Sequence, residues 1–184
     1  MNPLLARPLR ALFTVIDAVY RKWHGLVRVG PLFLIEPAMH QDDPRTLADG
    51  TVVKRGDAIG ELHFDSAYIE KYRKKGQHPG EGAFEFRRLF VPAFKALARE
   101  VAENPRWKEM VAFHAISWFP PHGLKFGFEA RPLPFNRKTR ALARHYTLIL
   151  YAYYPRGAKE LAKTIHPHEF WISRKRLVDN FNRP

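Results

Sequence analysis

The sequence predicts an α+β fold, with a mostly antiparallel sheet of about four or five strands packed against three or four helices. Three segments place apolar residues at helical spacing, and several shorter ones show the alternating or continuous apolar pattern of strands. The expected order is helix, strand, hairpin, helix, two strands, helix and short helix. Because this order lacks regular strand and helix alternation, we expect one sheet with the helices covering one side.

The first helix is expected over residues 8–24, where Pro8 suits a first turn and Gly25 a stop. Its apolar face either packs on the domain core, the interpretation that we favour, or lies in a membrane interface. Charged side chains interrupt this segment too often for a transmembrane span or a secretory signal. We therefore predict a cytoplasmic protein that can lie peripherally against a membrane. The face consists of Leu9, Leu12, Phe13, Ile16, Val19, Tyr20 and Trp23.

Two further long helices are expected at residues 86–104 and 136–154, with Asn136 as the N-cap of the second. Pro92 either kinks the first of these or marks its true first turn. Ser173 is expected to cap a short final helix in which Leu177 and Phe181 make apolar contacts. The buried stripes of the two long helices are expected to be Phe90, Phe94, Leu97 and Val101, and Leu142, Tyr146, Ile149 and Tyr153.

Strands are expected at residues 27–36, 51–54, 58–65, 111–118 and 124–130. The first is interrupted by Gly30-Pro31 and should be a bent or edge element. Turn residues on both sides of 51–54 predict a hairpin that leads into the 61–65 segment. The run 111–118 is apolar enough for a central strand, and we expect it to pair antiparallel with 124–130. Residues 66–83 should form an exposed loop and are a candidate for a mobile lid.

The chain of 184 residues has 46% hydrophobic and 27% charged residues, which is the composition of one globular domain spanning 1–184. It contains no Cys, and this absence excludes disulfides, thiolate catalysis and zinc sites built on sulfur. The sequence also lacks zinc-finger spacing, RNA-recognition aromatic motifs and Gly-rich phosphate loops. We therefore expect no cofactor.

The formal net charge is +13, and the basic excess lies mainly in the second half of the chain. Residues 1–92 carry 14 basic and 11 acidic side chains, whereas residues 93–184 carry 17 and 7. Between 131 and 159 there are seven basic residues and no acidic one, and Arg137, Arg140 and Arg144 share one helix face. This face either binds an anionic ligand or is simply solvated. Such a charge favours anionic partners without choosing among nucleic acid, lipid headgroups and anionic polymers.

The segment 58–65 is the most chemically loaded strand, because its two faces differ sharply. Ala58, Gly60, Leu62 and Phe64 should face the core, while the opposite face carries Ile59, Glu61, His63 and Asp65. The apolar Ile59 indicates that part of this opposite face is covered. A carboxylate beside an imidazole can orient it as a base or keep it charged. These three residues are the candidate catalytic set, although any half-exposed strand can show polar residues at alternate positions.

Five other residues are weaker candidates. His114 lies in an apolar run and is interpreted as a satisfied core imidazole. His166 and His168 could bind zinc with His63 or Asp65 as a third ligand, but the intervening Pro167 argues against this, so no metal site is assigned. Ser173 lacks the surroundings of a nucleophile. Arg174 is a candidate partner for Glu61 or Asp65, or a clamp for an anionic ligand.

Several short motifs occur in order along nearly the whole chain: Asp49-Gly50, Gly56-Asp57, Gly60-Glu61-Leu62-His63, Lys125-Phe126-Gly127-Phe128-Glu129 and Trp171-Ile172-Ser173-Arg174. With these motifs the chain resembles the YkoP-like domain, an uncharacterised family of Firmicute bacteria. This domain also occurs attached to polysaccharide deacetylases, and the resemblance therefore implies work at the cell envelope. Deacetylase chemistry itself is not implied, because the Thr-Phe-Asp-Asp-Gly strand and the His-x-x-x-His pair are absent.

These observations favour a non-catalytic accessory domain that binds an anionic or glycan component of the cell envelope. The strand 61–65 and the basic helix at 137–144 are its two candidate surfaces. One alternative is a small hydrolase that uses His63 with Asp65 or Glu61. Another is non-specific nucleic-acid binding through the basic helix.

Overall fold

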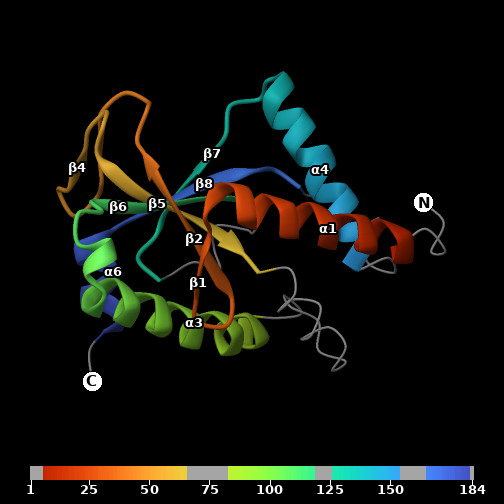
Figure 1. Ribbon diagram of the computed structural model, residues 1–184. Coiled ribbons are helices and arrows are strands. Elements are labelled where there is room, and N and C mark those ends of the chain that lie inside the picture. Colours follow the sequence, from red (N-terminus) through yellow and green to blue (C-terminus); the bar gives the residue numbers. More distant parts are fainter. Residues whose placement is uncertain (1–5, 66–82, 119–125, 154–164, 183–184) are drawn as a thin grey trace.

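A six-stranded sheet forms the centre of the protein, in the order β1-β2-β5-β6-β8-β7 (Figure 1). The computed structural model describes residues 6–65, 83–118, 126–153 and 165–182. Only β5 and β6 pair in parallel, and the other pairs are antiparallel. The strands are β1 (Val27–Val29), β2 (Phe33–Met39), β5 (Ala58–Phe64), β6 (Ala112–Ser117), β7 (Glu129–Pro132) and β8 (His168–Ser173).

Four α-helices are described: α1 (Ala6–His24), α3 (Ala83–Glu103), α4 (Arg137–Tyr153) and α6 (Arg174–Phe181). A short 3-10 helix, Pro105–Trp107, follows α3. Together with the sheet, these elements confirm the predicted α+β class. Pro92 lies inside α3 and not in its first turn. Asn136 accepts a hydrogen bond from the Thr139 backbone N–H at 2.9 Å, as expected of the N-cap of α4.

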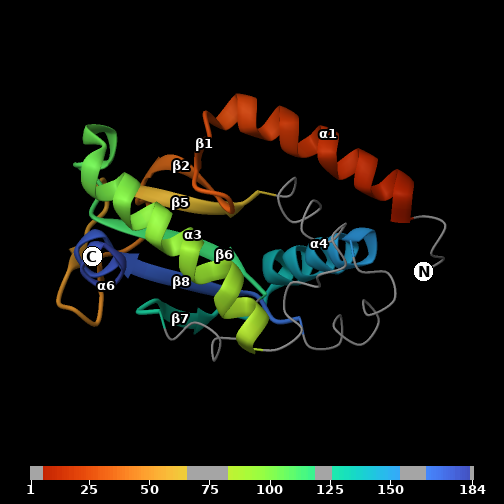
Figure 2. The same ribbon diagram turned by 90° about the horizontal axis from the view of Figure 1, so that it is seen from below.

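The main core lies between one face of the sheet and the helices α3 and α6 (Figure 2). The α3 residues expected to form a stripe are buried there with Phe33, Ile35 and Phe113 from the sheet. The expectation that all helices cover this one side is wrong. Helices α1 and α4 contact each other, and the end of α1 contacts the opposite face of the sheet through Tyr20. The helices therefore leave part of the opposite face uncovered, and polar side chains lie on it.

Four strand predictions need correction. Residues 27–36 form a hairpin of β1 and β2, turned at Gly30 with φ of 62°, and not one bent strand. The small hairpin pairs β3 (Arg45–Thr46) with β4 (Val52–Val53), so β4 does not pair with β5. The last two differences concern the other edge. The described strand there begins at Glu129 and pairs with β8, not with β6. Strand β8 itself, in a segment where no strand was expected, lies inside the sheet.

Candidate functional site on the open sheet face

The two faces of β5 are divided as the sequence predicts. Leu62 and Phe64 pack into the core under α3, whereas Glu61 and His63 point to the opposite face. There β5 is flanked by β2 and β6, which each add one polar side chain to this face, Glu36 and His114, among apolar neighbours such as Leu34 and Ala112. We call this surface the open sheet face and define it by Glu36, Glu61, His63, His114 and Glu169.

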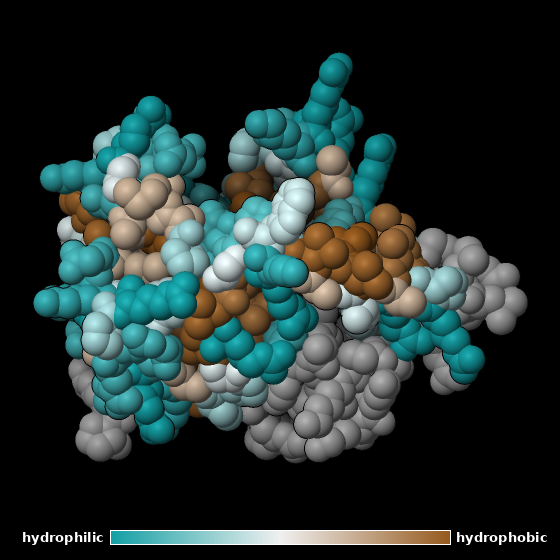
Figure 3. All heavy atoms as spheres, in the orientation of Figure 1, coloured by the Kyte–Doolittle hydropathy of each residue, from teal (hydrophilic) through white to brown (hydrophobic). Residues whose placement is uncertain are grey.

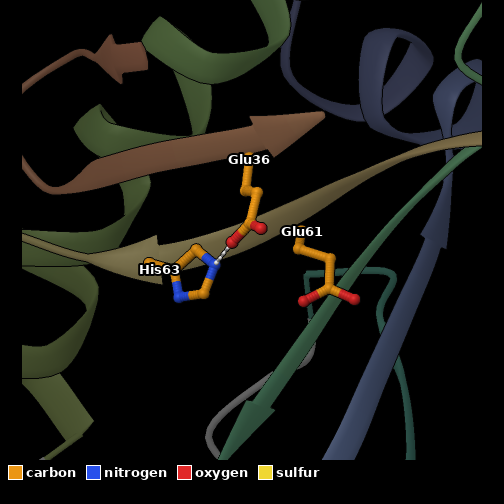
Figure 4. A group of neighbouring side chains, drawn as sticks. All are labelled: Glu36, Glu61 and His63. Carbon is orange, nitrogen blue, oxygen red and sulfur yellow. Dashed lines mark hydrogen bonds and ion pairs between the residues drawn. The ribbon is translucent and has the colours of Figure 1, made fainter. Parts of the chain in front are cut away.

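Glu36 is the site residue that sequence reasoning missed. It lies directly opposite Glu61 in the β2–β5 register and one diagonal step from His63. Its Oε2 atom is 3.0 Å from His63 Nε2, and the Glu61 side chain lies beside this pair on the same face of the sheet (Figure 4). Diagonal neighbours on antiparallel strands lie within reach of long side chains. Only the register of β2 against β5 could have revealed that these residues are neighbours.

The end of α1 closes one side of this group. The Tyr20 hydroxyl donates to Glu36 Oε2 at 3.1 Å, and His24 Nδ1 lies 2.8 Å from Glu36 Oε1. The Tyr20 ring stacks on His24 and contacts His63 edge-on. Burial and the adjacent Glu36 carboxylate raise the pKa of Tyr20 to about 12. The phenol therefore stays protonated and holds Glu36 in place.

On the other side, β6 and β8 extend the polar line. The His114 ring stacks on Trp171 at 4.3 Å, with Nδ1 3.9 Å from Glu61 Oε1 and Nε2 4.0 Å from Glu169 Oε2. The imidazole of His114 lowers the pKa of Glu61 and outweighs its burial. Within the described residues, His114 Nε2 is buried and has no hydrogen-bond partner. The prediction that His114 is a satisfied core imidazole is therefore wrong.

Glu169 is held by Arg45 from the β3–β4 hairpin. Arg45 Nη2 donates to Glu169 Oε1 at 2.5 Å, and its guanidinium lies 4.8 Å from the centre of the Trp171 ring. Burial raises the pKa of Glu169, but the Arg45 and Trp171 hydrogen bonds lower it by more. The charge of Glu169 is thus neutralised by Arg45. Within the described residues, the ion-pair partners of Glu36 and Glu61 are imidazoles alone.

Asp65 does not belong to the site, because it lies beyond the end of β5 with its side chain 0% exposed. It forms ion pairs with Arg21 of α1, at 3.2 Å, and with Arg28 of β1. The predicted set of Glu61, His63 and Asp65 is therefore split. A catalytic pair of His63 and Asp65 has no geometric support, and the carboxylate beside His63 is Glu36.

The remaining chain positions singled out from the sequence lie away from this group. Arg174 Nη2 donates to the Val101 carbonyl of α3 at 3.0 Å, so the expected pairing with Glu61 or Asp65 is wrong. Ser173 caps α6 by accepting from the Arg176 backbone N–H at 2.9 Å, as predicted. His168 shares the core-side face of β8 with Phe170. It therefore cannot share a metal with His63.

Comparison of the sequence with known protein families identifies the family of this chain. A family model described as the YkoP domain matches residues 6–181, which is nearly the whole chain. The chain belongs to the YkoP domain family. No curated protein and no solved structure matches it.

A second surface of this YkoP domain combines apolar and basic side chains. The apolar face of α1 is largely exposed, with Val15 at 61% and Trp23 at 84% exposed, so the favoured interpretation that it packs on the core is wrong. Only one edge of it is covered, where Phe13 and Leu9 pack on α4. Figure 3 shows a continuous apolar patch along α1 with hydrophilic side chains over α4 beside it. We define the α1 apolar stripe as Leu12, Val15, Ile16, Val19 and Trp23.

The basic helix predicted at 137–144 is the exposed first half of α4. Arg137, Arg140 and Arg144 are all exposed, while Tyr146 and Tyr153 are buried on the other side as expected. Phe135, just before the helix, is exposed and contacts the Arg140 guanidinium. None of the described helices combines the length and apolarity needed to cross a bilayer.

Proposed function

We propose that this YkoP domain is an accessory domain that binds the anionic lipid surface of a cell membrane. In this proposal the α1 apolar stripe enters the interface between headgroups and acyl chains, and the arginines of α4 contact the headgroups. The observation that carries the proposal is the exposure of five large apolar side chains on one helix beside a helix that is basic and free of acidic residues. The proposal narrows the expected anionic component of the cell envelope to a lipid surface.

The arrangement of side chains on α1 supports an interfacial role. With 3.6 residues per turn, the five residues of the α1 apolar stripe fall within about 100° of arc. Phe13 lies outside this arc, about 60° beyond Ile16, and is buried on α4. Moving one Val, Leu or Ile side chain out of water contributes about 1.5–3 kcal/mol. A stripe of five such residues left in water is therefore a strong driving force for docking.

Electrostatics selects an anionic lipid surface over a neutral one. Each Lys or Arg near such a surface contributes about 1 kcal/mol at physiological ionic strength. The chain carries a formal charge of +13, and Arg137, Arg140 and Arg144 project from the helix that packs against α1. Lys22 and Arg7 add exposed charges at the two ends of the stripe helix. Nucleic acid would use the same charges but would leave the stripe in water.

Vesicle sedimentation tests this proposal with the full chain. We expect binding to vesicles that contain phosphatidylglycerol, and at least about tenfold weaker binding to pure phosphatidylcholine vesicles. The double variant Val15→Ser/Val19→Ser should bind the anionic vesicles at least tenfold more weakly, because the apolar contribution is lost. Val52→Ser is the matched control, since Val52 is 44% exposed on a separate hairpin.

A charge-matched pair of variants tests the role of α4. The triple variant Arg137→Gln/Arg140→Gln/Arg144→Gln should lose vesicle binding, whereas Lys54→Gln/Arg55→Gln/Lys108→Gln should retain most of it. All six side chains are exposed, and the change in net charge is the same. Equal losses in the two variants would reduce the interaction to non-specific attraction. Full retention by Val15→Ser/Val19→Ser, together with tight binding to duplex DNA, would overturn the proposal in favour of nucleic acid.

A further inference from the structure

We propose that Glu36, Glu61 and His63 bind a divalent transition-metal ion on the open sheet face. The three side chains come from two adjacent strands and lie beside one another on one face of the sheet, with Glu36 and His63 in contact (Figure 4). Each offers one ligand atom, and these atoms all lie within 4.8 Å of one another. This site does not depend on the membrane surface proposed above, because it uses a different face and different residues.

The spacing of the ligand atoms is close to that of a formed site. An ion bound at about 2.1 Å by N and O ligands in tetrahedral geometry keeps them about 3.4 Å apart. Glu36 Oε2 and His63 Nε2 are already 3.0 Å apart. Glu61 is 41% exposed, so its side chain can rotate to shorten its distance to the other ligand atoms from within 4.8 Å to about 3.4 Å, a change of at most about 1.4 Å. An ion that replaces the proton between Glu36 and His63 can therefore be bound without moving the backbone.

The charges on this face also favour a bound cation. Glu36 and Glu61 are directly opposite each other on neighbouring strands, and like charges in this arrangement destabilise a sheet. In the part of the chain that the structure describes, Asp65 and Glu169 each have an arginine partner, but Glu36 and Glu61 have only imidazoles. A divalent ion would neutralise both carboxylates at once, with His63 as a neutral ligand.

Groups around the three ligands hold them as outer-shell residues do in metal sites. Tyr20 and His24 both contact Glu36, at 3.1 and 2.8 Å, and orient its two oxygens. His114 lies 3.9 Å from Glu61 and is only 13% exposed. Its Nε2 atom is buried and has no hydrogen-bond partner among the described residues, and this ring orients Glu61 from the side opposite to Glu36.

The ligand types favour Zn²⁺ or Mn²⁺ over Mg²⁺ or Ca²⁺. An imidazole nitrogen suits first-row transition metals, whereas Mg²⁺ and Ca²⁺ prefer oxygen ligands alone. With three protein ligands and no fourth supplied by the sheet, the ion keeps at least one position for water or an oxygen ligand. The chemical class of that ligand would be a hydroxyl or carboxylate oxygen donor.

Isothermal titration with Zn²⁺, and Mn²⁺ titration followed by electron paramagnetic resonance, test the site in the tag-free full chain. We expect one ion per chain. Glu61→Gln and His63→Gln should each weaken binding by more than about 100-fold, which exceeds the 10-fold to 100-fold loss typical of residues that only orient a ligand. Tyr20→Phe should fall within that smaller range. Circular dichroism and urea unfolding of each variant will show that the fold is retained.

Two controls separate this site from other histidines and carboxylates. Glu169→Gln removes a carboxylate from the same face that is already paired with Arg45, and it should leave the affinity within about threefold of the unmodified chain. His166→Gln/His168→Gln removes two adjacent imidazoles whose rings are 5.3 Å apart, and should also have little effect. Zinc binding that is lost in this double variant, or that persists in Glu61→Gln and His63→Gln, would overturn the proposal.

Discussion

Arg21 of α1 and Asp65, just after β5, form an ion pair of 3.2 Å whose carboxylate is fully buried. Arg28 of β1 contacts the other carboxylate oxygen. Asp65 therefore joins α1, β1 and the end of β5. This connection fixes the last turns of α1 against the sheet. Tyr20 and His24 are consequently held beside Glu36, whereas the residues of the α1 apolar stripe remain exposed.

Asp65 is therefore expected to be a structural residue and not a chemical one. Asp65→Asn should lower the free energy of unfolding by about 1.5–3 kcal/mol, because the buried carboxylate loses its charged contacts with two arginines that remain partly exposed to water. Urea unfolding followed by circular dichroism measures this loss. Asp42→Asn, at an exposed position, should change stability by less than about 0.5 kcal/mol. A loss of similar size in both variants would contradict the structural role of the Arg21–Asp65 pair.

The sequence was sufficient to predict the α+β class because helical and strand periodicities are local properties. The buried stripe of α3 and the two faces of β5 follow directly from spacing. Strand pairing is not local. Nothing near residues 124–130 or 168–173 specifies that β8 lies between β6 and β7, because that choice depends on packing under α3 and α6. The predicted pairing of 111–118 with 124–130 was wrong for this reason.

The candidate site was predictable only in part. Period-two spacing placed Glu61 and His63 on one face, since this needs only the strand itself. Asp65 continues the same alternation, but the strand ends before it, and the pairing of its buried carboxylate with Arg21 and Arg28 decides its role. Glu36 could be found only from the β2–β5 register. The exposure of the α1 apolar stripe was missed because periodicity predicts an apolar face and does not say what covers it.

The pair of Arg45 and Glu169 predicts a specific pH dependence of stability. The pKa of Glu169 is lowered in the folded state, so its contribution is fully present above its unfolded value of about 4.5. That contribution is lost as the pH falls through the lower folded value. Arg45→Gln removes this pairing, so that only the Trp171 hydrogen bond and His114 still oppose the effect of burial on the pKa of Glu169. The stability difference between Arg45→Gln and the unmodified chain should therefore be large at pH 7 and shrink below pH 4.5.

Urea unfolding between pH 7 and pH 3 measures this difference. A residual difference at pH 3 would report the lost contact of the Arg45 guanidinium with the Trp171 ring, 4.8 Å away, since that contact does not need a charged Glu169. A difference that is the same at pH 7 and pH 3 would assign the whole effect of Arg45 to this ring contact. It would contradict a stabilising charge on Glu169.

Gly60 tests the packing that separates the two faces of β5. It lies opposite Phe113 in the β5–β6 register, and a Cβ atom at Gly60 would come within 2.5 Å of the Phe113 ring and 3.1 Å of Ile35. Backbone entropy alone predicts that Gly60→Ala stabilises a strand, by about 0.5–1 kcal/mol. Overpacking against a fully buried ring predicts a loss of about 1–3 kcal/mol instead. We expect the loss, because Phe113 is enclosed by the core under α3.

In a double-mutant cycle with Phe113→Leu, the smaller side chain should relieve the clash, so that the double variant is more stable than the sum of the single effects predicts. Strict additivity, or a gain in stability for Gly60→Ala alone, would mean that β5 does not approach β6 this closely.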